Sequence, residues 1–222
     1  MLRELLQAGR YDEAKLYLAE APEEAPALEA LLNLRACLRS RDYQGAQKIL
    51  QSTPQLASYL DLQEAQRALA AFSQEEDLEA FLENPHLGAE AYCLKGVALA
   101  RQGALKEAQS AFQRALELDP GHYRAKTNLA NLALQEGHLE EAVQLYQEVL
   151  AEHPDYPNAH HNLAVAYRRQ GKIEESVHHL KQSQRLSLKT PRSALPRAPS
   201  AWSRRWWIAL LLLLALYWLV HR

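Results

Sequence analysis

Histidine is the residue type best suited to chemistry in this sequence, and four of the nine histidines form two adjacent pairs, His160-His161 and His178-His179. Adjacent residues on a helix point about 100° apart, so neither pair converges on one metal ion. The two pairs fall in different predicted helices, and no carboxylate lies four residues after either pair. We therefore expect solvated or packing histidines, and we predict no metal and no cofactor.

Acidic pairs are the other candidates for catalysis, because paired carboxylates can act as general acid and base. Three such pairs follow predicted turns: Glu75-Glu76, Glu140-Glu141 and Glu174-Glu175. Negative charge stabilises the first turn of a helix, which explains these pairs without catalysis. The sequence also contains no Gly-rich phosphate loop, no G-x-S-x-G and no H-E-x-x-H. It therefore predicts no enzyme and no catalytic residue.

The two cysteines, Cys37 and Cys93, lie in separate predicted helices and form no CxxC motif. We expect them to pack as small apolar groups and not as a disulfide, which fits a reducing compartment. Residues 1–188 are acidic, with 19 Lys and Arg against 27 Asp and Glu, whereas residues from Lys189 onward carry six basic residues and no acid. The acidic body argues against nucleic acid as a partner.

The elements that must position any functional side chain repeat with a period of 34 residues. Three stretches align without gaps: ALARQGALKEAQSAFQRALELDP, LALQEGHLEEAVQLYQEVLAEHP and AYRRQGKIEESVHHLKQSQRLSL. Their glycines, Gly103, Gly137 and Gly171, are spaced by 34. The other phased residues are Ala108, Ala142 and Ser176, then Phe112, Tyr146 and Leu180, and also Pro120 and Pro154.

This pattern predicts a helix-turn-helix hairpin in each repeat. The glycine ends the first helix, because a residue without a Cβ enters the left-handed region freely. The small residue lets the partner helix approach, the bulky residue one turn later fills the space beside it, and the proline closes the unit. One hairpin cannot bury its apolar face alone, so stacking of hairpins is required.

The repeats resemble the tetratricopeptide repeat (TPR) family. A repeat from Ala89 has the family's residue types at Tyr92, Gly96, Leu99, Ala108, Phe112, Ala115 and Pro120. A repeat from Tyr123 has them at Leu129, Ala130, Ala142, Tyr146 and Pro154, and one from Pro157 at Leu163, Ala164, Tyr167 and Leu180. The departures are Lys95, Lys126, Ala133, His160, Ser176, Ser183 and Leu188. The resemblance implies an all-α solenoid with well-marked repeats at 89–122, 123–156 and 157–188.

Residues 1–88 keep the same rhythm in a degenerate form. A turn and second helix are predicted at Gly9–Leu18 and again at Ser40–Leu50, and a break is predicted at Phe72–Gln74 before EEDLEAFLENP. This spacing predicts about five and a half hairpins over residues 1–188, the first with a truncated leading helix. An unrelated helical bundle in the first half is the alternative.

The resemblance also implies a concave groove lined by the first helix of each repeat. Its positions in the last two repeats are Arg124, Thr127, Asn128, Asn131, Leu134 and Gln135, then Asn158, His161, Asn162, Val165, Arg168 and Arg169. In the repeat from Ala89 they are Glu90, Cys93, Leu94, Val97, Ala100 and Arg101. Asn128 and Asn162 are expected to form an asparagine ladder that pairs with an extended peptide. Solvation of the surface is the alternative role for these asparagines.

One subtype of groove is not expected. In the family, clamps for chaperone C-terminal carboxylates combine lysines and asparagines at set groove positions. Asn128 fits that pattern, but Cys93, Val97, Asn158 and Asn162 occupy the other places. Without the lysines, the resemblance does not extend to a carboxylate clamp.

The C-terminal residues read as a linker and a membrane anchor. Residues 189–203 are basic and contain three prolines, and Trp206 to Val220 are uncharged and apolar on every side. Fifteen helical residues cover only about 22 Å, but snorkelling of Arg204 and Arg205 extends the usable length back toward Trp202. Aromatic residues border the segment at both ends, as they do at headgroup level: Trp206, Trp207, Tyr217 and Trp218. We predict a transmembrane tail anchor over 204–222.

The charge distribution predicts which side of the membrane holds the repeats. Lys189, Arg192, Arg197, Arg204 and Arg205 precede the apolar segment and only Arg222 follows, which favours a cytoplasmic body by the positive-inside rule. The first residues, MLRELLQAGRYDEA, do not read as a secretory signal. The sequence thus predicts a membrane-tethered scaffold for protein or peptide partners. A dedicated subunit of a membrane complex, for secretion, pilus or envelope biogenesis, is the alternative.

Overall fold

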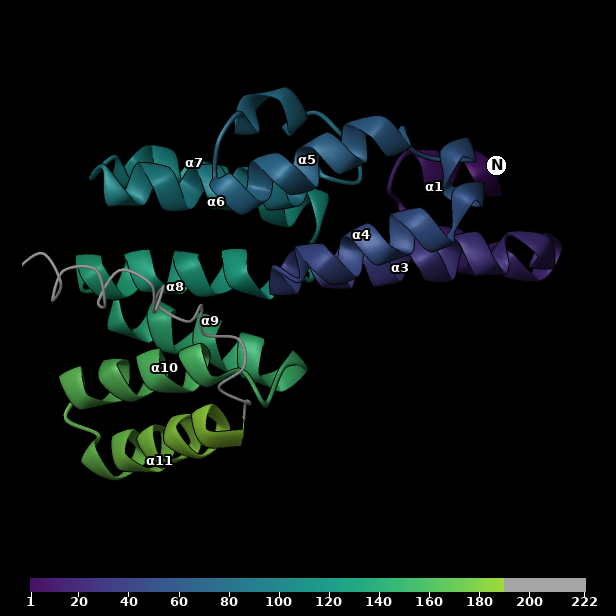
Figure 1. The fold of residues 1–222 in the computed structure, drawn as a ribbon. Coiled ribbons are helices and arrows are strands. Elements are labelled where there is room, and N and C mark those ends of the chain that lie inside the picture. The colour runs from purple at the N-terminus through teal and green to yellow at the C-terminus, as the bar shows by residue number, and fades with distance from the viewer. Residues whose placement is uncertain (190–222) are drawn as a thin grey trace, which may run out of the picture. The chain divides into compact units, whose positions relative to one another are not determined.

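A computed structural model describes residues 1–189, and every regular element in that range is a helix (Figure 1). One compact unit spans Met1–Gln184, and a second, Arg185–Arg222, is described only as far as Lys189. The prediction of an all-α fold of helix-turn-helix repeats is confirmed.

The α-helices are α1 (Leu2–Gln7), α2 (Tyr11–Leu16), α3 (Ala25–Ser40), α4 (Tyr43–Ser52), α5 (Leu62–Gln74), α6 (Gly88–Arg101), α7 (Leu105–Leu118), α8 (Tyr123–Glu136), α9 (Leu139–Glu152), α10 (Pro157–Arg169) and α11 (Ile173–Lys189). The 3-10 helices are η1 (Leu18–Glu20), η2 (Pro22–Glu24), η3 (Pro54–Ser58) and η4 (Leu78–Phe81). Within the described residues, this order gives six consecutive helix pairs. The first, α1/α2, is short, and the third, α5/η4, is incomplete.

The turns within the pairs use left-handed backbone, as the phased glycines predict. Gly103, Gly137 and Gly171 have φ values of +83°, +88° and +78°. In the earlier pairs Arg41 and Glu75 take the same role, with φ values of 60° and 58°. A residue with a Cβ enters this region at a cost of about 1–2 kcal/mol. Packing around these two turns must therefore offset a strain that glycine would avoid.

The small and bulky residues pack as the repeat pattern predicts. A Cβ on Gly96 of α6 would lie 2.5 Å from the ring of Phe112 on α7, so glycine permits this close approach. Ala108, Ala142 and Tyr146 are completely buried. The exception is Leu180 on α11, which is 38% exposed. Within residues 1–189 no helix follows α11, so this position has no next repeat to pack against.

The third pair differs from the prediction. We expected a break at Phe72–Gln74, but α5 continues through Gln74 and the break lies at 75–77. Glu75 was expected in the first turn of a second helix, and it instead caps the end of α5. Asp77 also has a positive φ, of 51°, so a regular helix cannot begin before residue 78, and the element that follows is the short η4. Glu140-Glu141 and Glu174-Glu175 do lie in first turns, of α9 and α11.

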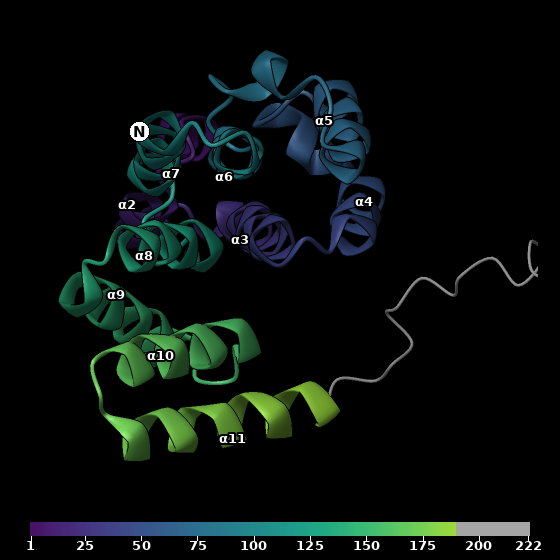
Figure 2. The ribbon, with the colours of Figure 1, turned by 90° about the vertical axis from the view of Figure 1, so that its left-hand side faces the viewer.

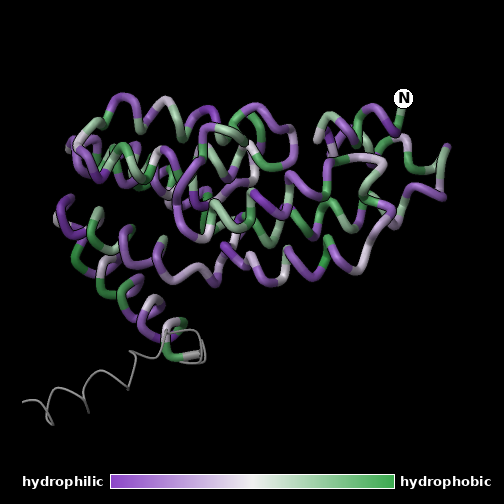
Figure 3. The backbone as a smooth tube through the Cα atoms, turned by 45° about the horizontal axis from the view of Figure 1, so that its top comes forward, coloured by the Kyte–Doolittle hydropathy of each residue, from purple (hydrophilic) through white to green (hydrophobic). Residues whose placement is uncertain are grey.

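The buried apolar residues of the described helices form three clusters, one across α1 to α6, one across α6 to α8 and one across α8 to α10. Hydrophobic and hydrophilic residues alternate along the tube in Figure 3. Figure 2 shows α3, α4, α5 and α6 surrounding a common interior, with α3 beside α8. Aromatic rings fill part of it: Phe72 lies 6.1 Å from Tyr43 and 5.7 Å from Phe81, measured between ring centroids. In the same view α8, α9, α10 and α11 stack in order.

The membrane prediction concerns residues beyond this range. Among residues 1–189, no helix has both the length and the apolar character needed to cross a membrane. The predicted linker, apart from Lys189, and the predicted anchor at 204–222 lie outside the described residues. The anchor residues concerned are Arg204, Arg205, Trp206, Trp207, Tyr217 and Trp218.

Candidate functional site

The predicted groove residues lie on one continuous face of the first helices α6, α8 and α10, which we call the inner face. Contacts between residues about one repeat apart establish this. Arg124 on α8 donates to both carboxylate oxygens of Glu90 on α6, at 2.9 Å. Asn162 on α10 donates to Asn131 on α8 at 2.7 Å. The inner face has two parts, a closed part at α6 and the start of α8, and an open part on the rest of α8 and on α10.

The open part carries a connected array of side-chain amides. Asn131 accepts from the Nδ2 of Asn162 at 2.7 Å and from the Tyr146 hydroxyl at 2.6 Å. The Nδ2 of Asn131 in turn donates to the Oδ1 of Asn128 at 3.3 Å. The predicted ladder of Asn128 and Asn162 therefore passes through Asn131, which joins the two and is held in place by a buried tyrosine.

The exposure of the other predicted residues shows where a partner could reach this part. Asn158, His161, Arg168 and Arg169 are exposed, whereas Val165 is half-buried against the core of the last repeats. Arg169 is also anchored, since its guanidinium donates to the Leu134 carbonyl at 2.7 Å. The open part therefore offers amide, imidazole and guanidinium groups. Its predicted positions on α8 and α10 include no acidic residue.

The closed part is covered, contrary to the expectation of a groove there. The predicted lining residues Glu90, Cys93 and Thr127 are buried, with exposures of 1%, 0% and 3%. The C-terminal end of α3 and the start of α4 cover it. The hydroxyl of Tyr43 donates to Glu90, and Arg124 also reaches the Leu38 carbonyl, at 3.4 Å.

Buried charge holds this cover in place. Asp119, at the end of α7, accepts from the Arg39 guanidinium and lies 3.5 Å from that of Arg35, both on α3. Burial works against ionisation of Asp119, but the hydrogen bond from Arg39 and the two guanidinium charges outweigh it and lower its pKa. Burial likewise opposes the charge on Glu90, and its bond from His122 and the charge of Arg124 lower its pKa. Both carboxylates are therefore paired anions.

Glu90, Cys93 and His122 also bring three possible metal ligands together, with their ligand atoms within 4.8 Å of one another. The hydrogen bonds oppose that use. The Nδ1 of His122 accepts from the Ala125 N–H at 3.3 Å, so the proton of a neutral ring sits on Nε2, which faces Glu90 at 3.1 Å. Burial raises the pKa of the Cys93 thiol to about 12. The cluster acts as a structural ion-pair network.

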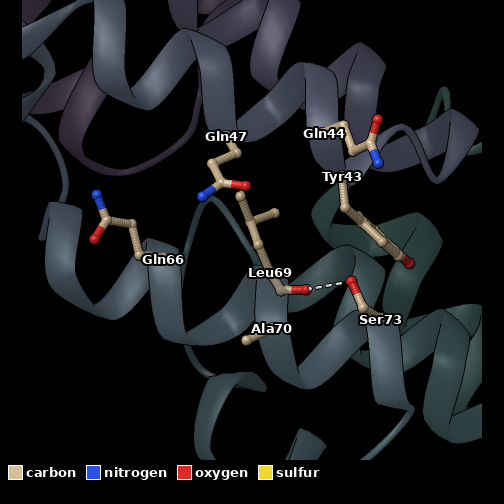
Figure 4. A pocket seen from close by; sticks show the side chains of 7 residues that line it. All are labelled: Tyr43, Gln44, Gln47, Gln66, Leu69, Ala70 and Ser73. Carbon is tan, nitrogen blue, oxygen red and sulfur yellow. Dashed lines mark hydrogen bonds between the residues drawn. The ribbon is translucent and has the colours of Figure 1, made fainter.

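A cleft of about 160 Å³ lies between α4 and α5 (Figure 4). Exposed glutamines of both helices border it, and Leu69 and Ala70 line its wall. Ser73 is not available to a ligand through its proton, since its hydroxyl donates to the Leu69 carbonyl at 2.8 Å. The cleft can offer hydrogen bonds, but it brings no acid, base and nucleophile together. Its residues are Tyr43, Gln44, Gln47, Gln66, Leu69, Ala70 and Ser73.

Sequence reasoning missed the cover over the inner face and the central role of Asn131. The pairs that attach α3, such as Arg39 with Asp119, join residues 80 positions apart. A repeat pattern reports only on neighbouring repeats, so it carries no signal for such a contact. For Asn131 a signal existed, because Tyr146 lies 15 residues later on the helix that pairs with α8.

Comparison with protein-family models supports the repeat structure. One model described as tetratricopeptide repeat matches residues 55–123 and 96–157, and a second with the same description matches 133–192. A comparison with curated proteins found no match. Among solved structures, one titled "Crystal structure of MamA protein" is 21% identical and covers 77% of this chain and 96% of its own, with a TM-score of 0.44. Another, titled "MamA AMB-1 P212121", is 15% identical and covers 78% and 100%, with a TM-score of 0.45.

Structural similarity with TM-scores of 0.44 and 0.45 carries no information on what this chain binds. The repeat matches together extend from residue 55 to residue 192, which is more than half of the 222 residues. They begin within the degenerate first half and include all three well-marked repeats. The chain belongs to the tetratricopeptide repeat family.

Proposed function

We propose that this protein is a scaffold that binds an extended segment of a partner protein on the open part of its inner face. The observation that carries this proposal is the amide array of Asn128, Asn131 and Asn162. A carboxamide presents both a donor and an acceptor, so it pairs with a peptide backbone whatever its side chains are. Hydrogen bonds within the array fix the direction of these amides before a partner arrives, which lowers the entropic cost of binding.

The neighbouring charges favour a neutral or acidic segment. Arg168 and Arg169 lie at the end of α10, and no acidic residue lies among the predicted inner positions of α8 and α10. The closed part limits the site to these two helices. A segment bound here would run across α8 and α10 and stop where α3 covers α6.

We further propose that residues 204–222 tether the scaffold to a membrane, with the repeats on the cytoplasmic face. The support is the sequence: an uncharged apolar segment bordered by tryptophans, preceded by five basic residues between 189 and 205. Tethering raises the effective concentration of the scaffold toward membrane-bound partners without any new contact. Each Lys or Arg of the linker that lies near an anionic lipid surface adds about 1 kcal/mol of attraction.

Site-specific cross-linking tests the binding surface. A photo-cross-linking residue at His161, on the open part, should capture a discrete set of partners, and the same residue at Glu107 on α7 should not. Capture from position 161 should fall at least about tenfold in an Asn162→Ala background, the equivalent of 1.4 kcal/mol. Equal capture from both positions, or capture that is insensitive to Asn162, would place the binding site elsewhere.

Fractionation tests the tether separately. The full chain should sediment with membranes and resist extraction at high salt, because apolar insertion is not screened. A chain lacking residues 206–220 should become soluble while it keeps its cross-linked partners. A full chain that stays soluble, or one released by salt alone, would rule out a transmembrane anchor and leave the binding proposal standing.

A second function, a permanent subunit of a membrane complex, is favoured by one observation. Ile173, Val177 and Leu180 repeat at helical spacing on α11 and are 58%, 45% and 38% exposed. Stable assemblies bury such surfaces, whereas transient scaffolds use more polar ones. Purification in mild detergent separates the two functions, since a subunit retains stoichiometric membrane partners and a scaffold loses its clients.

A further inference from the structure

Three histidines meet where α10 packs against α11, away from the inner face. The Nδ1 atoms of His160 on α10 and His179 on α11 are 2.9 Å apart. The ring of His178 lies 5.2 Å from that of His179, and the ring of Tyr167 lies 5.6 Å away on a stacked plane, both between centroids. His160 is 9% exposed and His179 is intermediate, so the pair is packed and yet reachable from solvent.

Hydrogen bonding sets the protonation of His160. Its Nε2 lies 2.9 Å from the Pro154 carbonyl, which can only accept, so Nε2 carries the proton. The Nδ1 of a neutral His160 therefore presents a lone pair toward His179. Metal-binding histidines show this arrangement, because donation of the other ring N–H to a carbonyl orients the ring and makes it more basic.

His179 can offer its Nδ1 in the same way. Its Nδ1 donates to His160 in the neutral pair. The proton can move to Nε2, which frees the second lone pair.

We propose that His160 and His179 bind a divalent transition-metal ion of the Zn²⁺ type through their Nδ1 atoms. Zn–N bonds are about 2.0–2.1 Å long, so two such ligands at a right angle are about 2.9 Å apart, and at the tetrahedral angle about 3.3 Å apart. The observed 2.9 Å thus needs at most a small opening of the pair, together with a rotation of the rings. Imidazole selects Zn²⁺, Cu²⁺ and Ni²⁺ over Mg²⁺ and Ca²⁺.

The remaining coordination positions fall to water and to exposed side chains of α11. Glu175, which is exposed, lies one helical turn before His179 on α11. The sequence pattern predicts no metal, because the two members of each adjacent pair lie on one helix and point apart. Packing of α10 against α11 takes one member from each pair and brings them together.

The His160–His179 pair differs from the buried cluster at Glu90 in the lone pairs that it can offer to a metal ion. There His122 uses Nδ1 as an acceptor and directs the Nε2 proton at Glu90, and Arg124 brings a positive charge to both carboxylate oxygens. At the His160–His179 pair no cation contacts either ring among the described residues; the Lys172 ammonium lies over Tyr167 instead, 5.6 Å from its centroid. A bound ion would therefore connect the two helices of the last pair, α10 and α11.

Calorimetric titration of the full chain with Zn²⁺, in detergent at pH 7.5, tests the proposal. The variant His179→Gln removes the ligand, while its amide can still donate to His160, so the fold should persist. The matched control is His138→Gln, which removes an exposed histidine from the turn before α9. We expect the original chain and the control to bind one Zn²⁺ alike, and His179→Gln to bind it at least tenfold more weakly.

Hydrogen exchange provides a second readout that does not depend on a variant. Zn²⁺ should slow exchange of the α10 and α11 amides in the original chain, because an ion that binds the folded state stabilises it. Binding that is unchanged in His179→Gln, lost equally in His138→Gln or absent from the original chain at about 1 mM Zn²⁺ overturns the proposal. Protection centred on Glu90 and His122 would overturn it too. Should His179→Gln fail to fold, His160→Gln replaces it with the same expectations.

Discussion

The position one residue into each well-marked repeat has three different fates in this molecule. It is Glu90 in α6, Arg124 in α8 and Asn158 in α10, each 34 residues after the last. Glu90 is buried at 1% exposure, the Arg124 side chain is 12% exposed and Asn158 is exposed. The repeat gives each residue the same place on its helix. What lies over that place decides whether it holds the fold together or faces a partner.

The comparison shows how a repeat protein limits its own binding surface. In the closed part, the end of α3 supplies the polar and charged partners that another protein would otherwise supply. In the open part the same face is left with amides that bond to one another and retain further capacity. The end of α3 and the start of α4 cover α6, and the proposed partner site is left on α8 and α10.

The largest effect should come from breaking the closed part. Glu90→Ala leaves Arg124 without the carboxylate that it contacts at two oxygens, and an uncompensated buried charge costs about 3–5 kcal/mol. Urea denaturation should show that loss in the free energy of unfolding. The exposed Glu107→Ala on α7 is the control, with a change within about 0.5 kcal/mol. A loss below 1 kcal/mol for Glu90→Ala would mean that α3 does not depend on this network.

Acidic pH should lower the stability of the first half of the chain more than that of the last helix pair, α10/α11. Burial of His86, which contacts the Tyr11 hydroxyl, lowers its pKa from 6.5 to about 4. The unfolded chain then binds the proton more readily, so this contribution is complete above pH 6.5 and is lost as pH falls toward 4. It amounts to roughly 3 kcal/mol. Burial, together with the neighbouring rings of His160 and His178, also lowers the pKa of His179. Because His179 is less buried than His86, its contribution to the pH dependence of stability should be smaller.

The measurement is the pH dependence of unfolding between pH 7 and pH 4 for the original chain, His86→Gln and His179→Gln. Each variant removes one contribution, so the difference in slope from the original chain isolates it. The slope should flatten more in His86→Gln. A larger change in His179→Gln would reverse the comparison between the two regions.

Removal of the central amide of the open part should have an intermediate effect. Asn131→Ala deprives the buried Tyr146 hydroxyl and Asn162 of their shared acceptor, at a cost of about 1–3 kcal/mol. Cross-linking of partners from position 161 should fall as well. Asn158→Ala, on the exposed rim, should leave stability unchanged. If Asn131→Ala left both stability and capture intact, the array would be a solvated surface only.

The smallest expected effect concerns the close contact between α6 and α7. Gly96→Ala should destabilise by about 1 kcal/mol, because its Cβ meets the buried Phe112 ring and this exceeds the gain in helix propensity. Alanine already stands at the corresponding Ala130 and Ala164, which are buried. Thermal unfolding measures the change. A gain in stability would show that the first well-marked pair is packed no more closely than the later ones.

Much of the fold could be predicted because the repeat is local. The phased glycines at 103, 137 and 171, the small residues five positions after them and the order of hairpins all depend on contacts within about one repeat. The third pair was predicted less well, since Glu75 and Asp77 enter the left-handed region without a glycine to announce the turn. The amide array was predicted in part, through Asn128 and Asn162 and not through Asn131.

By itself, the sequence determined the helix-turn-helix repeat, the residue types on the inner face and the contrast between an acidic body and a basic, apolar C-terminal segment. These follow from local propensities and a regular period. Only the tertiary structure decided that α3 covers α6, that Glu90 and Arg124 form a buried pair, and that His160 meets His179. The contacts of α3 join residues whose separation in sequence follows no period. Glu90 and Arg124 are one repeat apart, and His160 and His179 lie in one helix pair, but the period does not say which of their side chains meet or become buried. Packing geometry decides that.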